Sequence, residues 1–265
     1  MENEQFNLIK NIQITSNLII KPIFQTMKEC TDFILFGLKS IDTVTSSPEG
    51  LYDENSIFET MIGAPIDFDT QKQNYKDWLI RKGFEELIEG TKRSLSEAYF
   101  FIEGVEYVKK QLDEIVLSDL QEKMNSIRKK NFKKDLPKLL EKINKYSTSP
   151  LCWENQILTI NKARNCIVHR KGIVTKHDIN DKEDDNLIIK WAKFEIFYEY
   201  KNKEIAKRPI QVKLKNEIKE KSFKLGEKLK FDFKEFNEIV MTCFYFVLDL
   251  EEKIQEIEEQ YLTRE

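Results

Sequence analysis

The sequence predicts a mainly α-helical protein with a small antiparallel β insertion before its last helix. Three observations favour this fold class. The 265 residues include only 8 Gly and 6 Pro, too few for a sheet-rich fold with many tight turns. Apolar residues recur in steps of three and four along most of the chain, which is the helical period. Residues from about 186 to 233 are instead rich in β-branched and aromatic side chains, which favours short strands.

The pattern of the N-terminal part of the sequence predicts a helix, then a break, and then a long helix. Residues 23–41 are apolar and begin just after Pro22, so we expect a helix there, although FILFGL also fits a buried strand. Turn residues then interrupt the pattern. A long helix follows over 71–112, although its three glycines each cost about 1 kcal/mol relative to alanine. We divide the chain at the break, into an accessory helical segment, 1–70, and a main domain, 71–265.

Two shorter helices, near 116–130 and 136–145, precede the helix with the most unusual polar residues. Ser149 is a typical N-cap and Pro150 suits the first helical position. This helix should run to about His169, because Gly172 is a natural stop just beyond it.

The β insertion and a closing helix complete the predicted main domain. Residues 186–200, 208–215 and 227–233 each have strand-like composition and fit a two- or three-stranded antiparallel insertion. The closing helix, about 234–260, follows Asp232 and Glu235, which have the spacing of a capping box. Its apolar residues recur in steps of four and three, the pattern of a long packed helix: Phe236, Val240, Cys243, Val247, Leu250, Ile254 and Ile257.

Charge, cysteines and hydropathy limit the classes of function. The net charge is −3, so an anionic partner would need a local positive patch. The four cysteines form no CxxC pair, which argues against zinc and favours reduced thiols. The acidic start is unlike a signal peptide, and no apolar stretch is long enough to span a bilayer. We therefore expect a cytoplasmic protein that needs no membrane, metal or cofactor.

An arginine interrupts the apolar stripe of the helix that ends near His169. Continuing that stripe from Ile157 and Ile160 by four residues leads to Arg164. A guanidinium on a core face is costly unless it is paired or faces a polar cleft. At about 100° per residue, Asn165 and His169 lie within about 140° of Arg164, so the three polar side chains share one arc.

The surroundings of these three residues are basic. Residues 161–177 contain five Lys or Arg and no acid, and residues 121–142 contain eight bases and three acids. A phosphodiester would be attracted here, with Lys162, Arg170 and Lys171 as candidate RNA-binding residues. A histidine can transfer protons at the 2′-hydroxyl or the leaving oxygen, and an arginine can stabilise the charged phosphate. Because cleavage needs both an acid and a base, we expect a homodimer that brings two motifs into one cleft.

The run Arg164-Asn165-Cys166-Ile167-Val168-His169 resembles the RxxxxH signature of the HEPN superfamily, and a glycine follows it as in many members. The resemblance extends loosely over about 78–257. It implies a helical bundle, dimerisation that pairs two motifs, and metal-independent endoribonuclease activity. We expect such cleavage to leave a 2′,3′-cyclic phosphate or a 3′-phosphate end. Arg164 and His169 would be catalytic, and Asn165 would support them.

The resemblance also implies a biological setting. HEPN proteins serve as toxins or effectors in toxin–antitoxin control, antiviral defence and abortive infection, so a controlling partner protein is expected. Members that are silenced by AMPylation carry a tyrosine two residues after the histidine. Here that position is Lys171, so this form of silencing is not expected. Some members only bind RNA or nucleotides.

Two other functions remain open at this point. Asp185 with Glu199 and Lys201 mimics the D…ExK arrangement of metal-dependent nucleases. A non-catalytic adaptor could instead bind RNA or nucleotides, or hold a partner protein through the first 70 residues or the acidic tail.

Several signals also have purely structural interpretations. Arg164 could form an internal ion pair, and His169 could cap helix carbonyls. Cys166 fits core packing, His177 a solvated loop, and the basic run over 129–134 a solvated helix face.

Overall fold

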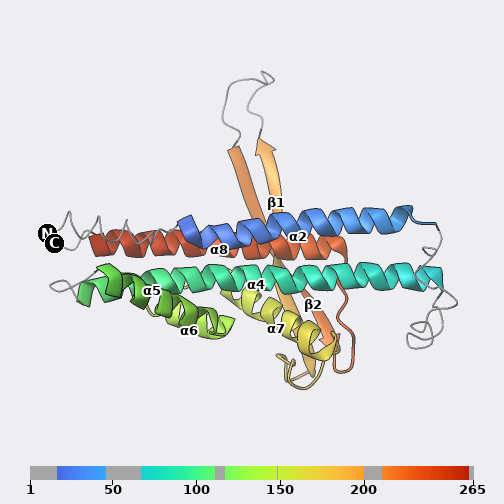
Figure 1. The fold of residues 1–265 in the computed structure, drawn as a ribbon. Helices are drawn as coiled ribbons and strands as arrows, with labels where there is room; N and C mark the ends of the chain where they lie inside the picture. Colours follow the sequence, from blue (N-terminus) through green and yellow to red (C-terminus); the bar gives the residue numbers. More distant parts are fainter. Residues whose placement is uncertain (1–16, 46–66, 111–116, 148, 200–210, 263–265) are drawn as a thin grey trace, which may run out of the picture.

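The computed structural model describes residues 17–45, 67–110, 117–147, 149–199 and 211–262. Three long helices lie side by side and form the body of the molecule, and three shorter helices pack along one side of it (Figure 1). The helices are α2 (Asn17–Thr43), α4 (Phe68–Lys110), α5 (Leu117–Phe132), α6 (Leu136–Asn144), α7 (Glu154–Arg170) and α8 (Phe233–Leu262). Strands β1 (Asn186–Glu199) and β2 (Gln211–Lys224) form one antiparallel hairpin before α8. The predicted mainly helical fold with a small β insertion is confirmed.

The first helix belongs to the same hydrophobic core as the rest of the described chain. Ile19, Ile23 and Ile34 of α2 are buried in one cluster with Phe84 of α4 and Phe236 of α8. The described part of the predicted accessory segment is therefore integral to the bundle. No helix in the described residues is long and apolar enough to cross a membrane.

Glycines allow the long helices to approach closely. A Cβ atom on Gly90 would lie 2.6 Å from Oγ1 of Thr26, and one on Gly83 would collide with Cδ1 of Ile34 and lie 2.7 Å from Cζ of Phe236. Such approaches are shorter than van der Waals contact, so a side chain there would push α2 or α8 away from α4. The close packing offsets the lower helix propensity of glycine, and α4 runs through both positions unbroken.

Two predicted helix starts are wrong, because tertiary contacts override the local signals. Helix α2 begins before Pro22 and continues through residues 33–38, which are not a strand. Its first turn is held by the buried side chain of Ile19. Helix α7 begins at Glu154 rather than at Ser149, after Trp153 in the left-handed region with φ of 65°. The buried Leu151 and the Cys152 N–H, which donates to the Asp249 carboxylate at 2.7 Å, keep the preceding residues outside the helix.

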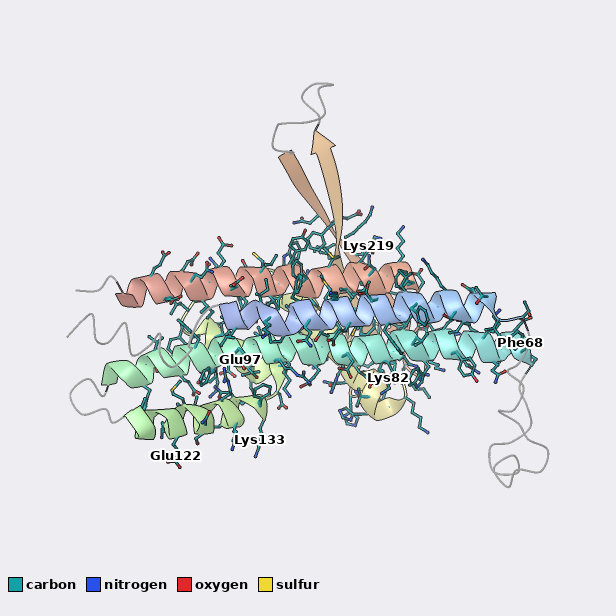
Figure 2. The ribbon with its side chains drawn as sticks, turned by 45° about the horizontal axis from the view of Figure 1, so that its top comes forward. Phe68, Lys82, Glu97, Glu122, Lys133 and Lys219 are labelled. Atoms are coloured by element: carbon teal, nitrogen blue, oxygen red, sulfur yellow. The ribbon has the colours of Figure 1, made fainter. Side chains whose placement is uncertain are left out.

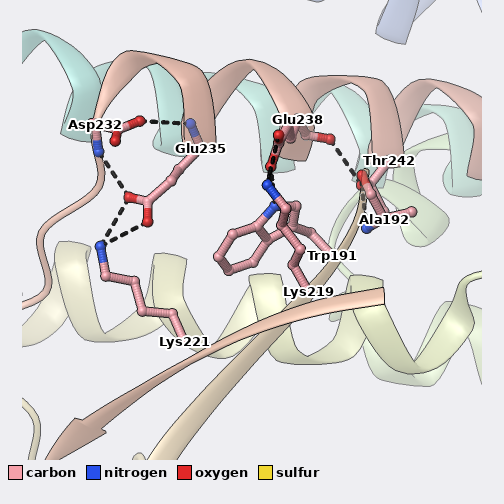
Figure 3. Close-up of polar contacts among 8 residues, drawn as sticks. All are labelled: Trp191, Ala192, Lys219, Lys221, Asp232, Glu235, Glu238 and Thr242. Carbon is pink, nitrogen blue, oxygen red and sulfur yellow. Dashed lines mark hydrogen bonds and ion pairs between the residues drawn. The ribbon is translucent and has the colours of Figure 1, made fainter. Parts of the chain in front are cut away.

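Helices α5 and α6 are confirmed close to their predicted bounds, and so is the start of α8. The Asp232 N–H donates to Glu235 at 2.9 Å and the Glu235 N–H donates to Asp232 at 2.7 Å, which is the predicted capping box (Figure 3). Lys221 of β2 adds an ion pair to Glu235 at 2.9 Å and so joins the hairpin to the start of α8. All seven apolar seam residues of α8 are buried.

Side chains take the place of a third strand along the free edge of β1. Alternate backbone N–H groups on this edge donate to side-chain oxygens: Ile188 to Asn180 at 2.7 Å, Lys190 to Thr159 at 2.9 Å, and Ala192 to Thr242 at 3.0 Å. Figure 3 shows the contact between Thr242 and Ala192. The predicted strand over 227–233 is reduced to a single bridge between Ile173 and Lys228. Because Thr159 lies on α7 and Thr242 on α8, β1 is fixed between these two helices.

Candidate functional site

Helix α7 carries the candidate site and is packed against β1, α4 and α8. Its inner face is apolar and includes the buried Ile157, Ile160 and Ala163. The helix ends as predicted, because Lys171 and Gly172 take positive φ values of 56° and 79° and turn the chain away. The Gly172 N–H donates to a carbonyl of the last turns at 3.0 Å, which closes the helix end.

The Arg164 guanidinium is only half-buried and has no carboxylate partner among the described residues. Its Nη1 donates to Oδ1 of the neighbouring Asn165 at 3.2 Å, while its buried Nε has no acceptor. An unsatisfied buried donor costs about 1–3 kcal/mol. An internal ion pair therefore does not explain Arg164 within the described chain, and its free N–H groups can bind an anion.

His169 lies in the last turn of α7 and is exposed. Within the described part of the chain its imidazole makes no hydrogen bond or ion pair, so capping of helix carbonyls does not occupy it. The structure thus joins Arg164 to Asn165 but leaves His169 separate, directed toward solvent.

Cys166 lies between these residues in sequence but is fully buried. Burial, with a smaller contribution from the negative charge of Asp178, raises the pKa of its thiol to about 11. A thiol with this pKa stays protonated at neutral pH, so Cys166 has the expected packing role rather than that of a nucleophile.

The three predicted RNA-binding residues have different environments. Arg170 is engaged by the buried carboxylate of Asp178, to which its Nε donates at 2.7 Å. Lys162 donates to the Ile179 carbonyl at 3.3 Å. Lys171 is exposed at the end of α7. Of the three, Lys171 is thus the one whose side chain is directed freely toward solvent.

The Asp178 carboxylate organises the loop that follows α7. It also accepts hydrogen bonds from the Thr175 N–H at 2.9 Å and from the Thr175 hydroxyl at 2.8 Å. Burial alone would raise the pKa of Asp178, but the hydrogen bonds from Arg170 and Thr175 outweigh it and hold the pKa below its ordinary value. The exposed His177, expected in a solvated loop, lies within this segment.

The metal-nuclease alternative gains no support from the described residues. Asp185 lies at a turn with φ of 51°, whereas the side chain of Glu199 and all of Lys201 lie outside the described residues. In the parts of the chain that the structure describes, no three His, Cys, Asp or Glu side chains are grouped to hold a metal ion.

Comparison with known proteins found no matching family model, no matching curated protein and no matching solved structure. The resemblance to HEPN proteins therefore depends on the motif of α7 and on the helical setting around it.

Proposed function

We propose that this protein is a metal-independent endoribonuclease of HEPN type that acts as a homodimer. Its role would be that of a toxin or effector in bacterial antiviral defence or toxin–antitoxin control, in the cytoplasm and under control of a partner protein. The main support for the proposal is the incomplete hydrogen bonding of the Arg164 guanidinium. Its half-buried guanidinium contacts Asn165, has a buried Nε without an acceptor, and lies five residues before an exposed histidine.

The chemistry uses the ribose hydroxyl as the nucleophile. A neutral His169 imidazole takes the proton of the 2′-hydroxyl, and the 2′-oxygen forms a bond to phosphorus as the bond to the 5′-oxygen breaks. A protonated His169 of the second copy gives a proton to the leaving 5′-oxygen. The Arg164 guanidinium donates to the non-bridging oxygens, where negative charge increases. The products are a 2′,3′-cyclic phosphate and a 5′-hydroxyl.

A dimer would supply the second imidazole that the reaction needs and that one α7 lacks. Each α7 carries one exposed imidazole at its end, whereas the reaction needs one base and one acid. A two-fold axis beside α7 would place two Arg164 and two His169 side chains around one phosphate. It would also bring polar groups to the buried Nε of Arg164, which has no acceptor within the described part of one chain.

The test is cleavage of single-stranded RNA by purified protein in EDTA, with the new ends analysed by mass spectrometry. We expect cyclic-phosphate ends and a loss of about 100-fold or more in both Arg164→Ala and His169→Ala. His177→Ala is the matched control, because it removes the other exposed histidine close in sequence and should leave the rate unchanged. Inhibition by EDTA, or full activity in His169→Ala, would contradict the proposal.

A second function, that of a protein-interaction adaptor, is favoured by a groove between α2 and α4. The groove has a volume of about 1010 Å³, and its aromatic side chains Phe33, Phe36 and Trp78 are 65%, 72% and 50% exposed. Exposed aromatic groups of this kind are typical of contacts with another protein, here an apolar helix of a partner. In cells, an adaptor would lose its effect in Phe36→Glu and keep it in His169→Ala, whereas a ribonuclease would lose it in His169→Ala.

A further inference from the structure

The segment 123–145, at the end of α5 and in α6, has a strong local excess of positive charge. It contains nine Lys or Arg and two acids, in a chain whose net charge is −3. Both acids already have partners, since Lys138 pairs with Asp135 at 3.1 Å and Lys145 with Glu141 at 3.2 Å. The remaining bases of the segment are therefore not neutralised by its own acids.

Three lysines around the turn between α5 and α6 are exposed and free of partners. Lys129, Lys130 and Lys133 make no hydrogen bond or ion pair with any described residue. Figure 2 shows Lys133 near the end of α5, directed away from α4. The neighbouring Phe132 is 38% exposed, so an exposed aromatic ring stands next to these lysines in the sequence. This surface, formed by residues 129, 130, 132 and 133, is called the α5 basic surface below.

Two further lysines of the same segment converge on the ring of Tyr99. Their Nζ atoms lie 4.5 Å (Lys134) and 5.0 Å (Lys142) from the ring centroid. Burial lowers the pKa of Lys134, and the positive charges of Lys142 and Lys130 add to this effect against the opposing charge of Glu103. The Lys134 and Lys142 ammonium groups thus lie close together on one ring, and a bound anion would offset the repulsion between them.

We propose that the α5 basic surface, together with Lys134 and Lys142, binds the phosphodiester backbone of single-stranded RNA. One phosphate is held beside Lys134 and Lys142, and the adjacent phosphates contact Lys129, Lys130 and Lys133. The Phe132 ring provides a platform on which an unpaired base can stack. This binding does not depend on whether α7 cleaves RNA.

An RNA strand fits this surface better than an anionic membrane does. Membrane-surface helices expose a broad apolar face next to their basic residues. Here the apolar residues of α6 are buried against the bundle, and among the described side chains of α5 and α6 Phe132 is the one large apolar group that is exposed. A single aromatic ring among lysines is typical of proteins that stack bases and neutralise phosphates.

The experiment measures fluorescence anisotropy of a labelled RNA of about 12 nucleotides, a length within the usual range of such sites. The full-length protein carries His169→Ala, so the probe stays intact. On that background, the triple substitution Lys129→Gln, Lys130→Gln and Lys133→Gln should weaken binding at least tenfold. It should also reduce the slope of log affinity against log salt by about 2, because each released phosphate contact contributes about 0.7.

The matched control is Lys39→Gln, Lys182→Gln and Lys224→Gln, which removes the same charge from exposed lysines elsewhere. This control should stay within twofold of the parent. Phe132→Ala should weaken RNA binding about tenfold without changing the salt slope. Inorganic phosphate should compete weakly, and phosphatidylserine vesicles should not bind better than RNA. Equal loss of binding in the two triple variants, or preferred binding to vesicles, would overturn the proposal.

The outcome stays distinct from that of the ribonuclease test. Intact RNA with the wild-type protein would count against the chemistry of α7, while the anisotropy would still report binding at the α5 basic surface. Cleavage combined with no difference between the two triple variants would count against the binding surface alone.

Discussion

The Asp178 carboxylate accepts hydrogen bonds from both Nε and Nη2 of Arg170, and this ion pair connects the loop after α7 to the end of the helix. The Asp178 carboxylate is 2% exposed and also receives two hydrogen bonds from Thr175. Because Arg170 is the residue after His169, the ion pair fixes the backbone that carries the candidate catalytic imidazole. Through this ion pair, Arg170 holds the end of α7, which carries the candidate site, against the following loop.

Asp178→Asn should destabilise the fold by about 3 kcal/mol, because it leaves the Arg170 guanidinium without its counter-charge. Urea unfolding at about pH 7 measures the effect. Asp184→Asn, an exposed position in the same segment, is the control and should change stability by less than about 0.5 kcal/mol.

Acidification should remove the difference between the wild type and Asp178→Asn. The folded pKa of Asp178 lies below its ordinary value of 3.8, so its ionised form stabilises the fold above that value. This stabilisation is lost as the pH falls through the lower folded pKa. Unfolding curves for the two proteins should therefore converge as the pH falls from 3.8 through the lower folded pKa. A difference that stays constant between neutral and acidic pH would contradict this assignment.

Thr242→Val should cost about 1–3 kcal/mol, although valine has nearly the same shape. The substitution leaves the Ala192 N–H, which now donates to the Thr242 hydroxyl at 3.0 Å, buried without an acceptor. Thr242→Ser keeps the hydroxyl and should recover most of the loss. Thermal unfolding of the three proteins checks this, and equal melting temperatures for the two variants would contradict it.

Gly83→Ala should destabilise the bundle by about 1–3 kcal/mol despite the better helix propensity of alanine. The new methyl group would collide with Cδ1 of Ile34, the atom that Ile34→Val removes. The double variant should therefore be more stable than the sum of the single effects predicts. Strict additivity in a double-mutant cycle would show that α2 and α4 are not in the close contact described.

Alkylation at about pH 8 should modify Cys152 first, because the other three thiols are buried. Burial, with added negative charge from Glu86 and Asp178 respectively, raises the pKa of Cys30 and Cys166 to about 11. Burial raises that of Cys243 to about 12. Mass spectrometry after a short iodoacetamide pulse should find one modified cysteine in the native protein and four in denaturant. Rapid modification of Cys166 would instead indicate an activated thiol.

Local sequence signals predicted the elements that depend on neighbouring residues. The capping box of Asp232 and Glu235 and the apolar seam of α8 are confirmed, because both are contacts within one helix or along one face. The starts of α2 and α7 were predicted wrongly, since Pro22 and Ser149 are overruled by contacts with distant residues.

In the candidate site, too, the features set by neighbouring residues could be predicted and those set by distant contacts could not. The motif helix, its glycine stop and the exposed His169 follow from spacing along one helix. The ion pair between Arg170 and Asp178 could not be predicted from that spacing, because it forms only when the loop after α7 folds back onto the helix. The side-chain ladder along β1 could not be predicted either, as Asn180, Thr159 and Thr242 come from three separate elements.

The long helix α4 has one more consequence for how an RNA strand would be handled. Its 43 residues span about 65 Å, and α5, α6 and α7 all pack directly on it. The lysines proposed to bind RNA and the residues proposed to cleave it therefore all lie on or next to helices that pack against α4. A strand held at both places would be cut at a constant number of nucleotides from the held phosphate, so fragment length would be set by the dimensions of the protein rather than by the order of the bases.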